Sequence, residues 1–113
     1  IPQVASMGIT EAEAIKRGHQ VKVGRFPFRA TGKALAIAET EGMVKLVTDA
    51  EYGDILGAHM IGPEVTEMLA ELSMAKSSEA TALEIGELVH AHPTLSEALM
   101  EAALSTNDMA IHN

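Results

Sequence analysis

The residues best suited to chemistry lie in one stretch, His90-Ala91-His92-Pro93-Thr94-Leu95-Ser96-Glu97. Pro93 disfavours helical backbone at the residue before it, so His92 is expected to sit on extended backbone just ahead of a helix. Glu97 follows five residues later. A carboxylate there can fix the Nδ1–H tautomer of His92 and leave Nε2 free to exchange a proton near neutral pH. The spacing therefore makes His92 and Glu97 a candidate acid/base dyad.

The same residues also allow a purely structural interpretation. Thr94 and Glu97 stand three residues apart ahead of the apolar-periodic run 98–104. This is the spacing of a capping box with Thr94 as the N-cap. In that interpretation Glu97 only caps the helix and His92 only packs. The spacing does not separate the two roles, and one carboxylate can serve both.

Metal binding is a third interpretation of this stretch. His90 and His92 alternate by two residues and would share one face of an extended segment. Zinc sites also need further histidine, cysteine or carboxylate ligands at characteristic spacings. The chain has no cysteine and no second ligand cluster of that kind, so we predict no metal site.

Length and composition predict a small globular unit. With 113 residues, of which 47% are hydrophobic, the chain can bury one core, so residues 1–113 are expected to form a single domain. Aromatic residues make up only 3% and methionine occurs seven times. The core is therefore expected to be built mainly from aliphatic and thioether side chains, with Phe26 and Phe28 packed into it.

Charge and hydropathy limit the partners and the cellular location that are expected for the chain. A formal net charge of −8 disfavours nucleic acid and suits either a basic protein partner or plain solubility. No apolar run approaches the ~20 residues that span a bilayer, and no charged-then-apolar leader opens the chain. The lack of cysteine fits a reducing compartment. We therefore expect a soluble, cytoplasmic protein without a membrane or nucleic-acid partner.

Hydrophobic periodicity predicts an α+β fold in which an antiparallel sheet of four to five strands is packed with helices. Strands are expected over 4–7, 19–26, 43–48 and 55–61, the last two joined by a polar hairpin loop. Helices are expected after the capping-box pairs Thr10/Glu13 and Thr81/Glu84, and over 33–38, 64–75 and 98–104. His59 lies inside a predicted strand and is expected to be structural.

Three blocks of the sequence resemble a known enzyme family. The stretch 90–98, HAHPTLSEA, is similar to the C-terminal signature of dihydrolipoamide dehydrogenase, a member of the pyridine nucleotide-disulfide oxidoreductases. The stretch 2–8, PQVASMG, resembles the family's entry into its C-terminal dimerisation domain, and 57–63, GAHMIGP, resembles its strand-to-helix junction. The blocks come in the family's order and cover essentially the whole chain. Leu95 and Ala98 favour the lipoamide branch.

The resemblance implies a dimerisation domain without the FAD- and NAD-binding domains. None of the nine glycines forms a G-x-G-x-x-G motif, and the redox-active cysteine pair is missing. FAD and NAD are therefore cofactors of the parent enzyme, and the isolated chain is expected to be inactive and to bind neither.

Roles for individual residues follow from the same resemblance. His92 corresponds to the acid/base group that accepts a thiol proton from dihydrolipoamide, and Glu97 to the carboxylate that orients it. The resemblance implies a cis bond between His92 and Pro93, with the backbone of both residues against the flavin of the partner subunit of a homodimer. His90 corresponds to a supporting position near the subunit interface.

Two functional hypotheses remain at this stage. In the first, the chain is the dimerisation domain of a dihydrolipoamide dehydrogenase, whose partners include the basic subunit-binding domain of a dehydrogenase-complex acyltransferase. In the second, it is a stand-alone dimeric interaction module that binds a basic protein partner through its acidic surface. The missing initiator methionine favours the first.

Overall fold

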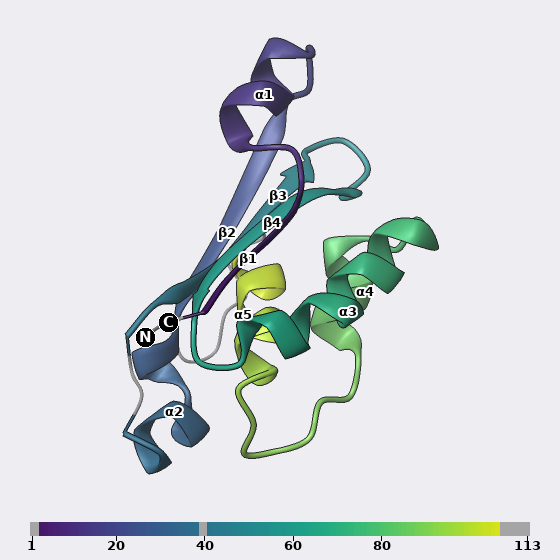
Figure 1. The fold of residues 1–113 in the computed structure, drawn as a ribbon. Helices are drawn as coiled ribbons and strands as arrows, with labels where there is room; N and C mark the ends of the chain where they lie inside the picture. Colours follow the sequence, from purple (N-terminus) through teal and green to yellow (C-terminus); the bar gives the residue numbers. More distant parts are fainter. Residues whose placement is uncertain (1–2, 39–40, 107–113) are drawn as a thin grey trace.

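A computed structural model describes residues 3–38 and 41–106 of the chain (Figure 1). In chain order the elements are β1 (Gln3–Gly8), α1 (Glu11–Lys16), β2 (Val21–Pro27), the 3₁₀ helix η1 (Phe28–Ala30), α2 (Gly32–Ala36), β3 (Met43–Asp49), β4 (Ile55–Gly62), α3 (Val65–Ser77), α4 (Ala82–Glu87) and α5 (Glu97–Ser105). No helix within these two ranges is long and apolar enough to cross a lipid bilayer.

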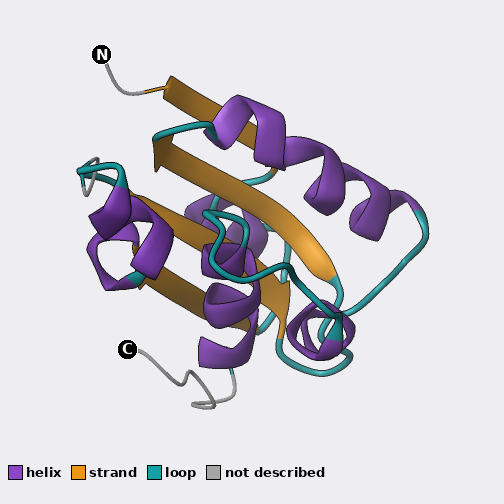
Figure 2. Cartoon of the chain, turned by 90° about the horizontal axis from the view of Figure 1, so that it is seen from below, coloured by secondary structure: helices purple, strands orange, loops and turns teal. Residues whose placement is uncertain are grey.

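The four strands form one antiparallel sheet in the order β1-β4-β3-β2. Helix α3 packs against β1 and β4, and α5 packs against β2 and β3, so the two helices cover neighbouring halves of the sheet (Figure 2). Helices α1 and α2 lie near opposite ends of the strands (Figure 1). The predicted α+β fold with an antiparallel sheet is confirmed.

The buried core lies between the sheet and these two helices. A row of buried residues crosses the sheet in register, each at most 6% exposed: Ala5, Met60, Val44 and Phe26. Both phenylalanines are fully buried, as predicted. Alternate side chains of each strand thus supply one wall of the core.

The start of β2 differs from the prediction. A strand beginning at His19 was expected, but β2 begins at Val21. The His19 backbone N–H donates to the Ala14 carbonyl at 3.1 Å, which closes the end of α1. Its imidazole bonds the Asp49 carboxylate at 3.1 Å. These local bonds keep His19 out of the strand ladder although its polar–apolar alternation fits one.

Two predicted helix starts are confirmed. The Thr10 hydroxyl accepts the Glu13 N–H at 3.1 Å and begins α1. Thr81 and Glu84 form a complete capping box at the start of α4, with each side chain bonding the other residue's backbone N–H. Local hydrogen bonds of this kind make helix starts readable from sequence.

Gly24 sets how closely α5 approaches the sheet. A Cβ at this position would lie 1.9 Å from the carbonyl oxygen of Ala102, so a larger residue cannot fit without moving the helix. Next to it, the Arg25 N–H donates to the Ser105 hydroxyl at 3.0 Å. The sheet therefore fixes the C-terminal half of the helix that begins with Glu97.

Candidate functional site

His92 and Glu97 form a direct pair. The two carboxylate oxygens of Glu97 lie 3.0 and 2.9 Å from Nδ1 of His92, which fits an Nδ1–H group donating to the carboxylate. The side chain of His92 is 75% exposed, whereas that of Glu97 is 15% exposed. The partly buried carboxylate can hold the exposed ring in one tautomer. In that tautomer Nε2 carries no hydrogen and can accept a proton.

Glu97 is itself fixed by the local backbone. Its Oε1 accepts the Thr94 N–H at 2.9 Å, and Glu97 is the first residue of α5. A carboxylate at a helix N-terminus is favoured by the positive end of the helix dipole. Leu95, 8% exposed, anchors the intervening turn in the core. Glu97 thus both reaches back to the backbone and orients His92.

The prediction that Thr94 is the N-cap is wrong. The N-cap of α5 is Ser96, and its side chain makes no capping bond. The Thr94 hydroxyl instead donates to the Ala91 carbonyl at 2.7 Å. Since that bond ties the hydroxyl to the preceding loop, only the Glu97 half of the expected box forms.

The bond between His92 and Pro93 is cis, as the resemblance implied. Both residues are exposed on the loop that joins α4 to α5.

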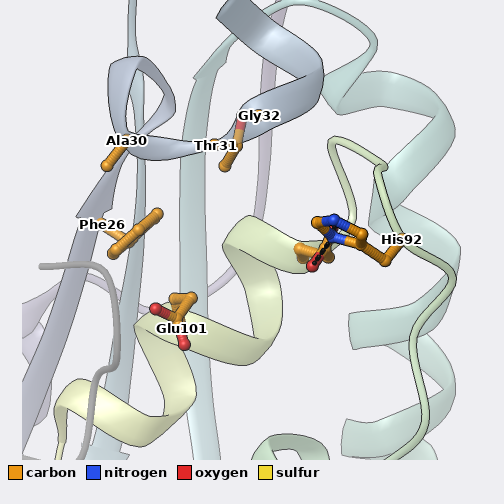
Figure 3. A pocket seen from close by; sticks show the side chains of 7 residues that line it. Phe26, Ala30, Thr31, Gly32, His92 and Glu101 are labelled. Carbon is orange, nitrogen blue, oxygen red and sulfur yellow. Dashed lines mark hydrogen bonds and ion pairs between the residues drawn. The ribbon is translucent and has the colours of Figure 1, made fainter.

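A cavity of about 220 Å³ lies beside the pair (Figure 3). His92 and Glu101 reach it from the loop and from α5, and Phe26 reaches it from β2. The remaining lining residues are Ala30, Thr31, Gly32 and Glu97. His92 and Glu97 therefore line a recess that separate parts of the chain build together.

Glu101 is a further residue of this site, and the motifs around His92 did not predict it. Its side chain is 1% exposed and lines the cavity. Glu101 stands four residues after Glu97, so the two carboxylates share a face of α5. That spacing was the available signal in the sequence.

His90 is separated from His92 by its surroundings. Its side chain is only 5% exposed, and its Nε2 lies 2.7 Å from a carboxylate oxygen of Glu71 on α3. The two histidines that the sequence suggested as possible metal ligands therefore face different carboxylates. Among the described residues there is no group of three or more potential metal ligands.

The other two described histidine sites are structural in their contacts. Nε2 of His59 bonds the Ile9 carbonyl at 3.1 Å, and Nδ1 lies 3.3 Å from the Ser6 hydroxyl. The Glu51 backbone N–H and the His19 imidazole bond the Asp49 carboxylate and hold its pKa below its ordinary value. Both sites lie outside the cavity of Figure 3.

The chain is similar to one family of known proteins over most of its length. The model of the family described as "Pyridine nucleotide-disulphide oxidoreductase, dimerisation domain" matches residues 1–103. A dihydrolipoyl dehydrogenase of Bacillus subtilis is 55% identical over 111 residues, covering 98% of this chain and 23% of the relative. One of Zymomonas mobilis is 51% identical over 111 residues, covering 98% and 24%. The chain spans about a quarter of the length of these relatives.

Solved structures show the same fold. LpdA of Mycobacterium tuberculosis matches with a TM-score of 0.84 and 21% identity, over 92% of this chain and 23% of that protein. The HOCl-induced flavoprotein disulfide reductase RclA of Escherichia coli matches with a TM-score of 0.84 and 23% identity, over 91% and 25%. At these identities the likeness is one of fold.

Proposed function

The chain belongs to the dimerisation-domain family of the pyridine nucleotide-disulphide oxidoreductases, and we propose that it serves a dihydrolipoyl dehydrogenase in which His92 is the acid/base group. The pairing of an exposed imidazole with a partly buried carboxylate carries this proposal. The identity of 55% and 51% to two dihydrolipoyl dehydrogenases supports the choice of substrate.

The proposed step is a proton transfer from a thiol of dihydrolipoamide. Nε2 of the neutral His92 ring accepts the thiol proton, so an S–H bond breaks, an N–H bond forms and the sulfur keeps the electron pair as a thiolate. Nδ1–H remains bonded to Glu97, 2.9 Å away, and the carboxylate stabilises the positive charge that appears on the ring. His92 lines the recess, which leaves room for a thiol beside its ring.

FAD and NAD belong to the proposed parent enzyme. The chain has no G-x-G-x-x-G motif and no cysteine, so other parts of that enzyme would hold both cofactors and the redox-active cysteines. The exposed His92 and Pro93 fit a contact with the flavin of a partner subunit, which supplies the electron acceptor for the thiols when bound.

A homodimer follows from this arrangement, because a site completed across a subunit boundary exists only in the assembled enzyme. The basic acyltransferase domain as a further partner stays a prediction from the resemblance, with which the acidic net charge is compatible. The cytoplasmic location stays a prediction from composition.

The test is His92→Gln in the full-length enzyme that contains this chain. Loss of the acid/base group should lower kcat with dihydrolipoamide by roughly 10²- to 10⁴-fold. Because the implied flavin contact is made by the backbone of His92, which the substitution keeps, dimer and flavin content should not change. His19→Gln is the matched control, since that histidine also pairs with a carboxylate but lies outside the cavity. Equal activity of the two variants would refute the role of His92.

A further inference from the structure

The loop over residues 88–96 carries His92 but contains no helix or strand. Most of its first half is exposed: Leu88 is 53% and Val89 is 94% exposed, and the His92 side chain is 75% exposed. The His90 side chain is the exception at 5%. Burial of one polar side chain in an otherwise exposed segment identifies His90 as the anchor of this half of the loop.

Both ring nitrogens of His90 face oxygen atoms. Nδ1 lies 2.9 Å from the Leu88 carbonyl oxygen, and Nε2 lies 2.7 Å from Oε2 of Glu71. The first contact stays within the loop, and the second joins the loop to α3. His90 is therefore held at both nitrogens of its ring.

The other charged groups near His90 have different partners. Glu84 of α4 lines the same groove as Glu71, but its carboxylate bonds the Thr81 N–H at 2.9 Å. Glu97 of α5 bonds His92 and the Thr94 N–H. Glu71 of α3 is thus the carboxylate that is placed to bond His90, and the bond links the loop to a helix 19 residues earlier in the chain.

His59 is also bonded at both ring nitrogens, but by different groups. Its Nε2 lies 3.1 Å from the Ile9 carbonyl oxygen, and its Nδ1 lies 3.3 Å from the Ser6 hydroxyl. His90 differs because one of its partners is a carboxylate on a separate helix, and hydrogen bonds to a carboxylate are stronger than those to neutral groups.

We propose that Glu71 is a positioning residue, which holds His90 through the bond to Nε2 and thereby fixes the loop that presents His92. This inference rests on the proposed function of His92 for its catalytic meaning. The pair itself exists independently of that function. Glu71 acts through His90 on the backbone from residue 90 to residue 92 and does not touch the reacting atoms.

The test uses the 113-residue chain with ¹⁵N-labelled histidine. Glu71→Ala removes the group that bonds Nε2 and should shift the ring ¹⁵N signals of His90, while those of His59 stay in place. Glu67→Ala, one turn away on the exposed side of α3, is the matched control and should leave the His90 signals unchanged.

Positioning is measured by exchange of the Thr94 amide hydrogen, which is bonded to Glu97. Glu71→Ala removes a charge-assisted hydrogen bond and should speed this exchange by about tenfold or more, relative to the Leu46 amide of β3 as an internal standard for global unfolding. Glu67→Ala should not change the ratio. Glu71→Gln should restore most of it, since the geometry of the bond survives.

Two results would overturn the proposal: His90 ring signals that do not respond to Glu71→Ala, or equal Thr94 exchange in Glu71→Ala and Glu67→Ala. If Glu71→Ala does not fold, Glu71→Gln decides instead, since unchanged His90 signals in that variant would show that Glu71 does not bond the ring. None of these readouts uses enzyme activity. A failure here therefore leaves the proposed role of His92 standing, and loss of that role would leave the His90 result intact.

Discussion

His90 and His92 each bond a carboxylate, yet the two pairs differ in burial and in the distance along the chain between the partners. The His92 side chain is 75% exposed and its partner, Glu97, is five residues away. The His90 side chain is 5% exposed and its partner, Glu71, is 19 residues away on α3. The same two residue types thus produce an accessible pair and an enclosed one within three residues of each other.

The difference shows how one loop can combine access with rigidity. An exposed imidazole that uses one nitrogen has the other available for proton transfer. A buried imidazole that uses both nitrogens has none to offer, but it ties the backbone to a helix. In the proposed function the enclosed His90–Glu71 pair holds the loop in place, and the accessible His92–Glu97 pair transfers the proton.

The largest effect is expected from Gly24→Ala, which should disturb the helix that supports the His92–Glu97 pair and not the helix that supports the His90–Glu71 pair. The new Cβ would lie 1.9 Å from the Ala102 carbonyl and 2.8 Å from the Thr106 methyl, so α5 must shift. We expect a loss of about 1–3 kcal/mol in the free energy of unfolding, measured in urea. Signals of His92 should change, because Glu97 begins α5, while those of His90, held by α3, should not.

Gly32→Ala is the control for that substitution. Its added Cβ would have the Pro93 Cβ at 4.0 Å as its nearest neighbour, which is an ordinary contact. Its stability should stay within about 0.5 kcal/mol of the parent value. If Gly24→Ala unfolded at the same urea concentration as this control, the close approach of α5 at Gly24 would not limit stability. If it disturbed the signals of His90 as much as those of His92, the two pairs would not have separate supports.

The sequence predicted the accessible pair but not the enclosed one, for a physical reason. His92 and Glu97 belong to one short segment, and Pro93 restricts the backbone between them, so their spacing carries the information. The bond from His90 to Glu71 depends on how α3 packs beside the loop, and no local spacing encodes that contact.

The same difference between short-range and long-range contacts explains which parts of the fold were predicted. Strand alternation predicted the strands and the Thr81/Glu84 box predicted the start of α4, since alternation and capping both depend on residues close in sequence. The expected N-cap at Thr94 failed because its hydroxyl bonds Ala91 in the loop instead. His19 likewise fitted a strand by alternation but was held outside it by Ala14 and Asp49.

A smaller effect is expected at the other end of the loop, from Thr94→Ala. This change removes the 2.7 Å bond from the hydroxyl to the Ala91 carbonyl and should cost about 1 kcal/mol. Thr94→Ser keeps the hydroxyl and should recover most of the loss. Faster amide exchange should be confined to residues 91–94, because Thr94 does not cap α5. Equal acceleration in the first turn of α5 would instead restore the N-cap interpretation.

The smallest effect concerns His19 and Asp49, a third histidine–carboxylate pair, with side chains 34% and 19% exposed. The Glu51 backbone N–H and His19 lower the pKa of Asp49 in the folded chain. A carboxyl whose folded pKa is depressed stabilises the fold at neutral pH, and that stability is lost as the pH falls through the acidic range. Asp49→Asn should therefore lower the urea midpoint slightly at pH 7, and the difference from the parent chain should shrink as acid protonates the parent carboxyl.

Asp54→Asn is the control, since Asp54 lies in the same hairpin. A deficit of Asp49→Asn that persisted undiminished into acid would show that the stabilising effect of the bonds to Glu51 and His19 does not depend on the charge of Asp49.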